Sequence, residues 1–536
     1  MAAVAQAPRR ALVLIGFMGA GKSTLAERLA HKLNTRALDS DELLRERFGH
    51  SIAEEFERNG EQAFRAAEEE LVCELLDSAG PGSVIALGGG SILSARVRTA
   101  LESHVAVLLD IDVEQAWERV SGAPESSAGS LSRPLARDRE AFFSLHAERT
   151  GLYESAAHAF VPQLRSDETS GMLDALRALA AAPAGTRLLW AQSASGDYPV
   201  LLGRGLLRAA GTAAEEGTAD LWPLDRARSR GFCITDEAVG PLYLDELGGL
   251  LGSLAILPGE EQKTLRTAQR VWEALVTAGV DRGDHLVALG GGVVGDLAGF
   301  CAATYQRGIP VVQIPTTLLA QVDSAYGGKT GVDLPQAKNY VGAYHQPAGV
   351  LVDPEVLESL PQAELQAGWV EVLKTALIAG GELWERVASG ADLDDWTILA
   401  CARTKLAVVA ADERDGGRRQ VLNLGHTIGH AIETATDYAR YRHGEAVGLG
   451  LLAALRLSGA EQLREQVAEL LAARDLPVKL EGAGVEQITA AAARDKKRVG
   501  KTLPFVLLAQ PGQPQVGCAV AQQDLQAAVA ELIQQR

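Results

Sequence analysis

Cysteine is scarce in this 536-residue chain, and its five cysteines lie far apart without a Cys-x-x-Cys pair. This distribution argues against a disulfide framework or a thiolate zinc site and suits a reducing cytoplasm. Positive charge is also in deficit: the net charge is −18, whereas nonspecific nucleic-acid binding needs clustered positive charge. No apolar run reaches the roughly 18 residues of a membrane span, and the first residues show no secretory signal pattern. We therefore expect a cytoplasmic protein that binds neither nucleic acid nor a membrane.

Short apolar runs are present in number up to about residue 355, for example at residues 84–87, 286–289 and 311–315. They alternate with longer amphipathic stretches, and this alternation is typical of buried parallel strands connected by helices. After residue 355 strand patterns almost vanish, and Ala, Leu, Glu and Arg predominate, which favours helices. The sequence therefore predicts an α/β protein whose last part is mostly α-helical.

A phosphate-binding loop occupies residues 16–23, where Gly-Phe-Met-Gly-Ala-Gly-Lys-Ser fits G-x-x-x-x-G-K-[ST]. An apolar run precedes it and a helix-like stretch follows, which is the context that this motif requires. Its backbone N–H groups would cradle phosphates, Lys22 would neutralise the outer ones, and the Ser23 hydroxyl would bind Mg²⁺. The alternative is a glycine-rich turn beside a surface lysine, which the flanking segments disfavour. The motif predicts a nucleoside triphosphate site.

Three further polar features of the first half should lie near this loop. Asp39-Ser-Asp41 follows the first helix, Arg65 and Glu68 lie on a helical stretch, and Gly88-Gly-Gly90 ends an apolar run. Ligands of such sheets bind beyond the carboxyl ends of the strands. A carboxylate that accepts hydroxyl protons, facing arginines that bind a carboxylate in a forked geometry, suits a small polyhydroxy acid.

With these motifs, the stretch from about residue 10 to 165 resembles shikimate kinase. The resemblance implies that shikimate is bound through its hydroxyls by Asp41, through its carboxylate by Arg65 and Arg149, and next to the backbone of Gly88, Gly89 and Gly90. It implies that ATP and Mg²⁺ are held by Gly19, Gly21, Lys22, Ser23, Thr24, Asp39 and Arg119. Lys22, Asp41 and the lid residue Arg133 would be catalytic. The Gly/Ser-rich segment 121–130 is longer than the family pattern leads us to expect.

The second half contains another glycine-rich turn, Leu289-Gly-Gly-Gly-Val-Val-Gly-Asp296, at the end of an apolar run. Glycine allows a close approach of the backbone to a pyrophosphate, although alone this is a weak dinucleotide pattern. Lys329, Lys338 and Asn339 follow, and Arg307 precedes them. This cationic neighbourhood suits a phosphorylated substrate.

Three of the ten histidines fall close together, in Asn423-Leu-Gly-His426-Thr-Ile-Gly-His430 and in His443-Gly-Glu. The spacing of His426 and His430 places both on one helix face. Each histidine alone would more often be structural. Together with a carboxylate and an open position, the cluster suits catalytic zinc.

From about residue 187 to 536 the chain resembles 3-dehydroquinate synthase. The resemblance implies that Glu371, His426 and His443 hold Zn²⁺ or Co²⁺. It implies an NAD⁺ site at Asp236, Glu260, Lys263, Gly291, Gly292, Asp296, Thr316, Thr317 and Lys338. The catalytic groups would be His430, Lys329, Lys374 and Asp323, and the substrate would also contact Arg307, Asn339, Lys405, Arg419, Asn423 and one of Lys496 and Lys497, of which Lys497 is the expected one. Ala238 replaces an amide of the family pattern, so one cofactor hydrogen bond is expected to be missing.

These resemblances imply a bifunctional enzyme of aromatic amino-acid biosynthesis. One half would transfer phosphate from ATP to the 3-hydroxyl of shikimate. The other would convert 3-deoxy-D-arabino-heptulosonate 7-phosphate to 3-dehydroquinate: NAD⁺ oxidises a hydroxyl to a ketone, the neighbouring C–H becomes acidic, phosphate leaves, the hydride returns, and an aldol step closes the ring. Two alternatives are a gluconate- or nucleoside-type kinase joined to a polyol dehydrogenase, and a regulatory nucleotide-binding protein without turnover.

The expected organisation is a P-loop kinase-type parallel-sheet domain at residues 1–180 and a linker at 181–186. A Rossmann-like NAD-binding α/β domain follows at 187–355, and a helical metal and substrate domain at 356–536. We expect small-molecule substrates and a homodimer formed through the synthase half.

Overall fold

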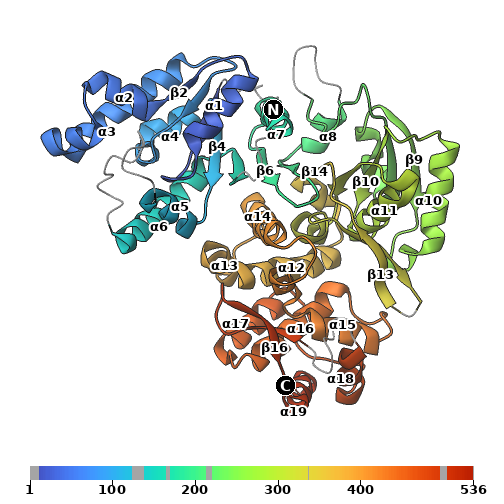
Figure 1. The fold of residues 1–536 in the computed structure, drawn as a ribbon. Helices are drawn as coiled ribbons and strands as arrows, with labels where there is room; N and C mark the ends of the chain where they lie inside the picture. The colour runs from blue at the N-terminus through green and yellow to red at the C-terminus, as the bar shows by residue number, and fades with distance from the viewer. Residues whose placement is uncertain are drawn as a thin grey trace. The chain divides into compact units, whose positions relative to one another are not determined.

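The computed structural model describes residues 11–122, 138–163, 169–212, 220–335, 337–494 and 504–534 (Figure 1). Contacts divide the chain into two compact units. The first comprises Met1–Ala191 and Asp197–Pro223, and the second comprises Gln192–Gly196 and Leu224–Arg536. The segment 181–186, expected as a linker, begins with the last residue of a helix and ends directly before a strand, and both elements belong to the first unit. In the described part of the chain, no helix is both long and apolar enough to cross a membrane.

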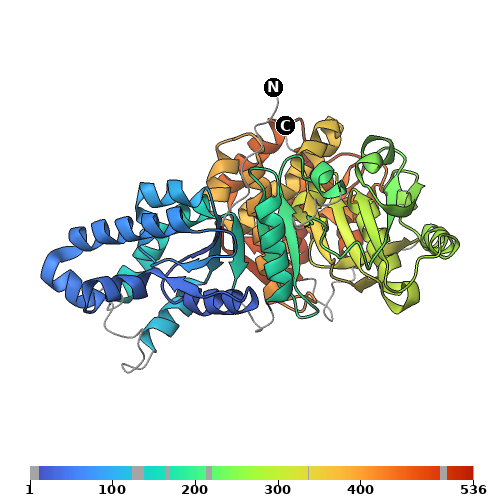
Figure 2. The same cartoon turned by 90° about the horizontal axis from the view of Figure 1, so that it is seen from above.

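The first unit is a sheet with helices on both sides of its strands (Figure 2). Its strand order is β2-β3-β1-β4-β5-β6-β7, and every pairing is parallel except that of β6 with β7. The strands are β1 (Leu12–Ile15), β2 (Ala37–Asp39), β3 (Val84–Ala86), β4 (Val105–Asp110), β5 (Ala159–Pro162), β6 (Arg187–Ala191) and β7 (Tyr198–Leu202). The helices are α1 (Lys22–Lys32), α2 (Ser40–Phe48), α3 (Ile52–Ser78), α4 (Ala95–Leu101), α5 (Val113–Ser121), α6 (Arg139–Ala156), α7 (Ser170–Ala181) and α8 (Leu206–Gly211).

Local sequence explains where these elements begin and end. β1 is buried along its whole length, as a central parallel strand should be. The Asp39 side chain accepts hydrogen bonds from the backbone of Asp41 and Glu42 and so caps α2. Ser51 and Glu54 form a capping box at the start of α3, and Gly60 interrupts that helix with a φ of 80°. The parallel α/β fold predicted from the alternating pattern is confirmed.

The second unit begins with a parallel sheet of order β14-β11-β10-β8-β9. Its strands are β8 (Gly231–Asp236), β9 (Leu250–Ile256), β10 (His285–Gly290), β11 (Val311–Pro315) and β14 (Gly349–Val352). A buried apolar cluster joins β8, β10 and β11 to α10 (Leu265–Thr277) and α11 (Gly292–Thr304). An antiparallel hairpin of β12 (Lys329–Leu334) and β13 (Ala337–Tyr344) packs on α11. Sequence patterning did not predict this hairpin.

The rest of the second unit is mostly helical, as expected. It contains α12 (Gln362–Ala379), α13 (Gly381–Ala388), α14 (Asp395–Ala411), α15 (His426–Ala435), α16 (His443–Leu457), α17 (Glu461–Ala472), α18 (Val485–Arg494), the hairpin β15 (Pro504–Leu508) and β16 (Pro514–Ala519), and α19 (Gln522–Gln534). Glycines allow α16 to pack closely. A Cβ at Gly444 would collide with the Ala367 carbonyl of α12, and one at Gly450 with the Gly425 carbonyl before α15. Helices α12, α15 and α16 are thereby held together.

Candidate active sites

The phosphate-binding loop lies between β1 and α1, as predicted. Lys22 donates to the carbonyl oxygens of Gly16 and Phe17 over 2.8 and 3.2 Å, so its ammonium lies inside the loop. Ser23 Oγ donates to Asp39 Oδ2 over 2.5 Å. Gly19 and Gly21 have φ values of 81° and 92°, which disfavour side chains. The loop therefore has the shape, charge and oxygen ligands for phosphates and Mg²⁺.

The predicted shikimate residues converge beyond the ends of β2 and β3. A Cβ at Gly88 would collide with the Asp41 carboxylate, and one at Gly90 would collide with the Arg65 guanidinium. Arg149, on α6, donates to the carbonyl of Gly89 over 3.1 Å. The structure thus brings together one carboxylate, two arginines and a stretch of bare backbone. This set can bind a polyhydroxy carboxylate.

Two partners of this set were given no role in the sequence analysis. Glu68 is buried, accepts a hydrogen bond from Arg65 over 2.6 Å and another from Ser91 Oγ over 2.9 Å. Tyr153 donates to the Gly89 carbonyl over 2.5 Å. The i, i+3 spacing of Arg65 and Glu68 on a helix is a pattern from which their pairing could have been predicted. Arg119 Nη1 donates to the Gly19 carbonyl over 3.0 Å, and Arg133 lies outside the described residues.

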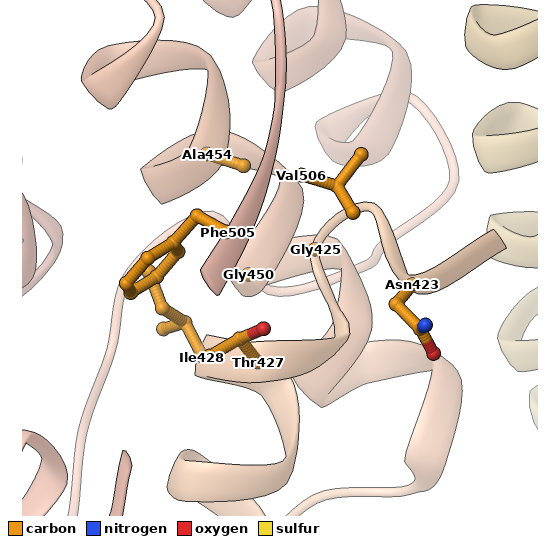
Figure 3. A pocket seen from close by; sticks show the side chains of 8 residues that line it. All are labelled: Asn423, Gly425, Thr427, Ile428, Gly450, Ala454, Phe505 and Val506. Atoms are coloured by element: carbon orange, nitrogen blue, oxygen red, sulfur yellow. The ribbon is translucent and has the colours of Figure 1, made fainter. Parts of the chain in front are cut away.

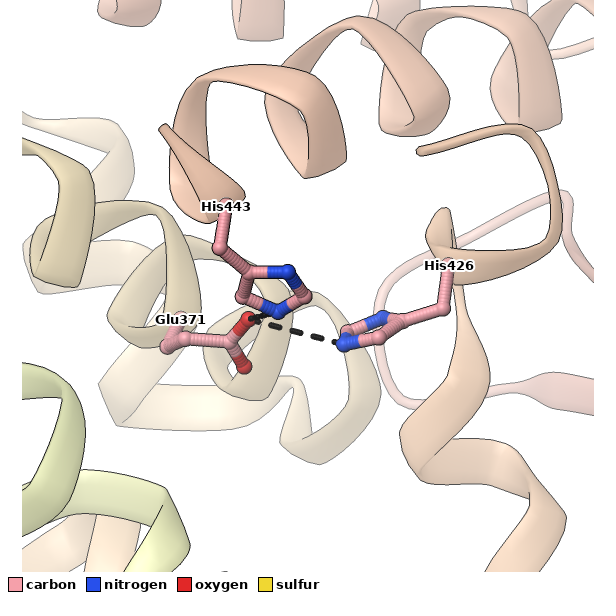
Figure 4. Close-up of side chains that lie close together, drawn as sticks. All are labelled: Glu371, His426 and His443. Atoms are coloured by element: carbon pink, nitrogen blue, oxygen red, sulfur yellow. Dashed lines mark ion pairs between the residues drawn. The ribbon is translucent and has the colours of Figure 1, made fainter. Parts of the chain in front are cut away.

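In the second unit, Glu371, His426 and His443 converge from α12, α15 and α16 (Figure 4). Nε2 of His426 lies 3.6 Å and Nε2 of His443 lies 3.8 Å from Glu371 Oε1. The carboxylate is buried, and Oε1 receives no hydrogen bond from the described residues. Unpaired buried oxygens are costly, whereas two imidazoles and a carboxylate form a donor set for zinc. The residues therefore fit a divalent metal.

Lysines and Asp323 form a buried charge cluster next to these ligands. Lys374 forms an ion pair with Glu371, and its Nζ lies 3.8 Å from Asp323 Oδ1. Lys405 Nζ lies 2.8 Å from the same Oδ1. Burial opposes ionisation of Asp323, but Lys374 and Lys405 hold its pKa well below the ordinary value. Burial lowers the pKa of Lys405 to about 8, against the opposing effect of Asp323.

Three other predicted substrate residues, Lys329, Arg419 and Arg307, differ from one another in burial and in their contacts. Lys329 forms an ion pair with Asp415 over 2.6 Å. Arg419 is buried, and its guanidinium donates to the carbonyls of Gly327 and Glu413. Arg307 is exposed and makes no ion pair with the described residues. It follows the far end of α11, about 20 Å along the helix from the glycine-rich turn.

The structure describes two more of the predicted substrate residues, Asn339 and Asn423, whereas Lys497 lies outside the described residues. Asn339 has a left-handed backbone with φ of 54° and donates its N–H to Asp333. Asn423 lines an apolar pocket with Phe505, Ile428 and Ala454 (Figure 3). None of the three metal ligands lines that pocket. Lys497 and its neighbour Lys496 fall in the part of the chain without a description.

Most of the predicted NAD⁺ residues lie at the carboxyl ends of β8, β9, β10 and β11 or on the segments that follow them, and Lys338 lies on β13. Gly291 and Gly292 join β10 to α11, and a Cβ at Gly291 would lie 2.8 Å from the Thr317 side chain. Thr316 and Thr317 follow β11 directly. This is the edge at which open α/β sheets bind dinucleotides. Asp236 accepts the N–H of Ala238 over 2.9 Å, and Ala238 offers no side-chain amide there.

A row of alternating charges joins these NAD⁺ residues to the metal ligands. Lys263 Nζ lies 3.3 Å from Asp296 and 2.9 Å from Glu260. Lys338 Nζ lies 3.8 Å from Glu260 and 3.4 Å from Glu433. Glu433, on α15, also lies 3.5 Å from Nδ1 of His443. Burial raises the pKa of Glu433, but its hydrogen bond to His443 and nearby positive charge hold the pKa at about 2. The sequence analysis did not single out Glu433.

The two sites define two enzymes on one chain: a phosphotransferase with a P-loop, and an enzyme whose site suits NAD⁺ and a metal. Residues 18–180 match the family model described as shikimate kinase. Residues 253–367 and 368–498 match the N-terminal and C-terminal models of 3-dehydroquinate synthase. The 3-dehydroquinate synthase of Halorhodospira halophila is 43% identical over 342 residues, which span 61% of this chain and 94% of that protein. The chain belongs to the 3-dehydroquinate synthase family and carries a shikimate kinase domain as well.

Solved structures agree with this assignment. A 2-deoxy-scyllo-inosose synthase complexed with carbaglucose-6-phosphate, NAD⁺ and Co²⁺ has a TM-score of 0.56 and 26% identity, covering 65% of this chain and 99% of its own. The 2-epi-5-epi-valiolone synthase of Streptomyces hygroscopicus subsp. jinggangensis 5008, with NAD⁺ and Zn²⁺ bound, has a TM-score of 0.55 and 26% identity, covering 62% and 96%. The chain is therefore a bifunctional enzyme, a transferase and a lyase. NAD⁺ with Co²⁺ or Zn²⁺, which the sequence analysis expects for this chain, is bound in these two solved structures.

Proposed function

We propose that Glu371, His426 and His443 hold the metal of the synthase reaction, in which heptulosonate phosphate becomes 3-dehydroquinate and phosphate. The observation that carries this proposal is that both imidazole Nε2 atoms face the single Glu371 Oε1, at 3.6 and 3.8 Å. When bound, the metal supplies Lewis-acid polarisation of the alcohol that NAD⁺ oxidises.

The surrounding residues would bind and orient the substrate. Lys405 and Lys329 place ammonium groups where they can bind an anionic substrate, and Asp323 keeps two of the buried lysines charged and oriented. His430 lies one turn after His426, with ring centroids 5.4 Å apart, and can take or return a proton close to the metal site. Arg419, Asn339 and Asn423 would complete the substrate contacts, with Arg307 and Lys497.

In the kinase domain, Lys22 and Ser23 would hold the phosphates and Mg²⁺ of ATP. Asp39 supports this arrangement because it accepts the hydrogen bond of Ser23. Asp41 would accept the proton of the attacking hydroxyl and orient the ring, since an oriented nucleophile and stabilised phosphoryl charge are what phosphoryl transfer requires. Arg65 and Arg149 would bind the shikimate carboxylate, with Glu68 holding Arg65 by an ion pair of 2.6 Å.

The organisation of the chain belongs to the same proposal. The kinase would occupy residues 1–180, with a linker at 181–186, an NAD-binding domain at 187–355 and a metal and substrate domain at 356–536. The synthase half would form a homodimer in the cytoplasm. Sedimentation of the full chain tests the dimer, because a monomer at micromolar concentration would contradict it.

Assaying one purified preparation with each substrate tests the proposed function. ADP release should depend on shikimate. Phosphate release from heptulosonate 7-phosphate should depend on NAD⁺ and on zinc or cobalt, and should equal the 3-dehydroquinate formed. NADH should not accumulate, since the hydride returns in each cycle. Accumulation of NADH with simple polyols would favour the dehydrogenase alternative, and absence of both turnovers would favour the regulatory one.

Synthase activity should decline as the pH rises through about 8. Lys405 is charged below its pKa of about 8 and neutral above it, and an anionic substrate needs the charged form. In the free enzyme kcat/KM reports this ionisation, so it should fall about tenfold per pH unit on the alkaline side. Lys405→Arg keeps the charge at high pH and should move or remove this limb of the profile. An identical alkaline limb in that variant would contradict the assignment.

A further inference from the structure

Glu433 connects two residues that the proposed function assigns to different ligands. Its carboxylate is buried within α15 and lies 3.5 Å from Nδ1 of His443 and 3.4 Å from Nζ of Lys338. His443 is one of the three metal ligands, and Lys338 is a predicted NAD⁺ contact. One carboxylate therefore faces both the metal site and the cofactor site.

The two ring nitrogens of His443 point to different carboxylates. Nε2 faces Glu371, at 3.8 Å, where the metal ligands converge, and Nδ1 faces Glu433. A metal-binding imidazole must be neutral, with its lone pair on the nitrogen that faces the metal. A carboxylate at the other nitrogen fixes the hydrogen there, and with it the tautomer and the ring orientation.

Glu433 could itself be a ligand, because His430, Glu433 and His443 form a second group with suitable spacing. The direction of the His443 ring argues against this. Glu433 faces Nδ1, whereas both Nε2 atoms of His426 and His443 face Glu371. A metal among the Nε2 atoms and Glu371 leaves Nδ1 of His443 to donate to Glu433.

Lys338 is held from three sides. Besides Glu433, it lies 3.8 Å from Glu260 Oε1, and its ammonium lies 4.2 Å from the centroid of the Tyr438 ring. Tyr438 adopts a left-handed backbone with φ of 55°, which is uncommon for an aromatic residue. An ammonium between two carboxylates and an aromatic face has little freedom to move.

We propose that Glu433 is a positioning residue of the synthase, which orients His443 toward the metal and Lys338 toward NAD⁺ with one carboxylate. This proposal rests on the proposed metal and NAD⁺ sites. It makes Glu433 a shared support of both, although it contacts neither ligand. Removing its charge should therefore weaken two binding events at once.

The test is Glu433→Gln in the full chain, which keeps the size of the side chain and removes its charge. Zinc affinity, measured by competition with a chromophoric chelator, should fall about 10- to 100-fold, as for other supports of metal-bound histidines. NAD⁺ affinity, measured by calorimetry without substrate, should fall about tenfold, as expected for a lost charge-assisted hydrogen bond. With Co²⁺ bound, the visible absorption band should shift, because the His443 ring is no longer fixed.

Three further variants separate the possible causes. Glu486→Gln on α18 makes the same chemical change at an exposed position and should alter neither affinity. Lys338→Met should weaken NAD⁺ but not zinc, which shows that Glu433 acts on His443 directly. Glu433→Asp retains the charge and should recover part of both affinities. A near-UV circular dichroism spectrum of each variant that matches the wild-type spectrum shows that the variant is folded, so that a loss of affinity comes from misplaced side chains.

The outcomes distinguish this proposal from the proposed function. If the wild type binds zinc and NAD⁺ and Glu433→Gln binds either of them equally well, the shared positioning role is wrong and the proposed function stands. If the wild type binds no zinc, the metal site itself is wrong.

Discussion

Replacing Lys22 with alanine should abolish phosphorylation of shikimate and leave the formation of 3-dehydroquinate unchanged. The ammonium of Lys22 lies inside the phosphate loop, within 3.2 Å of two of its carbonyl oxygens. During transfer it would stabilise charge on the phosphoryl oxygens, and removal of one such group costs about 10²- to 10³-fold in rate. A coupled ADP assay with shikimate and a 3-dehydroquinate assay on the same preparation measure both effects.

Lys32→Ala is the matched control for this variant. Lys32 lies at the other end of α1, where its ammonium donates to Ser170, and it is remote from the phosphate loop. Its replacement should leave both activities near the wild-type level. Loss of both activities in a folded Lys22→Ala protein would contradict two independent sites.

Spacing along the chain is sufficient to predict part of each site. The phosphate loop is contiguous in sequence, so the motif alone places its glycines, Lys22 and Ser23 together. His426 and His430 share a helix face, which the i, i+4 spacing predicts. The pairing of these groups with residues far away, such as Glu371 with His443, came from the family resemblance, because no local pattern brings α12 and α16 together.

Glu433 shows what could have been found and was not. It follows His426 by seven residues and His430 by three, so helical periodicity places it on the same face of α15. The role of that face depends on Lys338 from β13 and His443 from α16, which the fold brings beside it.

The β12–β13 hairpin was missed for a different reason. Glycines at 331 and 342 and the polar pair Lys338 and Asn339 interrupt the alternation of apolar side chains that indicates a strand.

Grouping of strands also depends on distant contacts. β6 pairs with β5 in parallel and with β7 in antiparallel fashion, and these three strands fall in the first unit by contacts. The Ala-rich segment before β6 is a compositional break, yet composition does not determine which neighbour a following strand pairs with. The pairing partner of such a strand is determined by packing in the assembled sheet.

Removal of divalent metal should abolish 3-dehydroquinate formation, even with excess NAD⁺. Glu371 is almost completely buried, and its Oε1 receives no hydrogen bond from the described residues, so the site is built for a cation. A metal that polarises the reacting alcohol contributes several kcal/mol, and its loss should lower turnover by at least about 10³-fold. Exhaustive dialysis against a strong chelator, followed by assay in metal-free buffer, measures this loss.

Adding metal back to the metal-free protein tests whether loss of the metal caused the loss of synthase activity. Added Zn²⁺ or Co²⁺ should return synthase activity, because the nitrogen and oxygen donors of its site bind either ion. Mg²⁺ alone should restore only the kinase activity, because the Mg²⁺ ligands there are a hydroxyl and phosphate oxygens. His426→Ala should resemble the metal-free protein and should not be rescued by zinc at the wild-type concentration. A change at Glu382, exposed on α13, to Gln serves as the control and should leave the metal requirement unaltered. Full cyclisation in the absence of bound metal would refute the assignment of Glu371, His426 and His443, since the reaction would then proceed on protein groups and NAD⁺ alone.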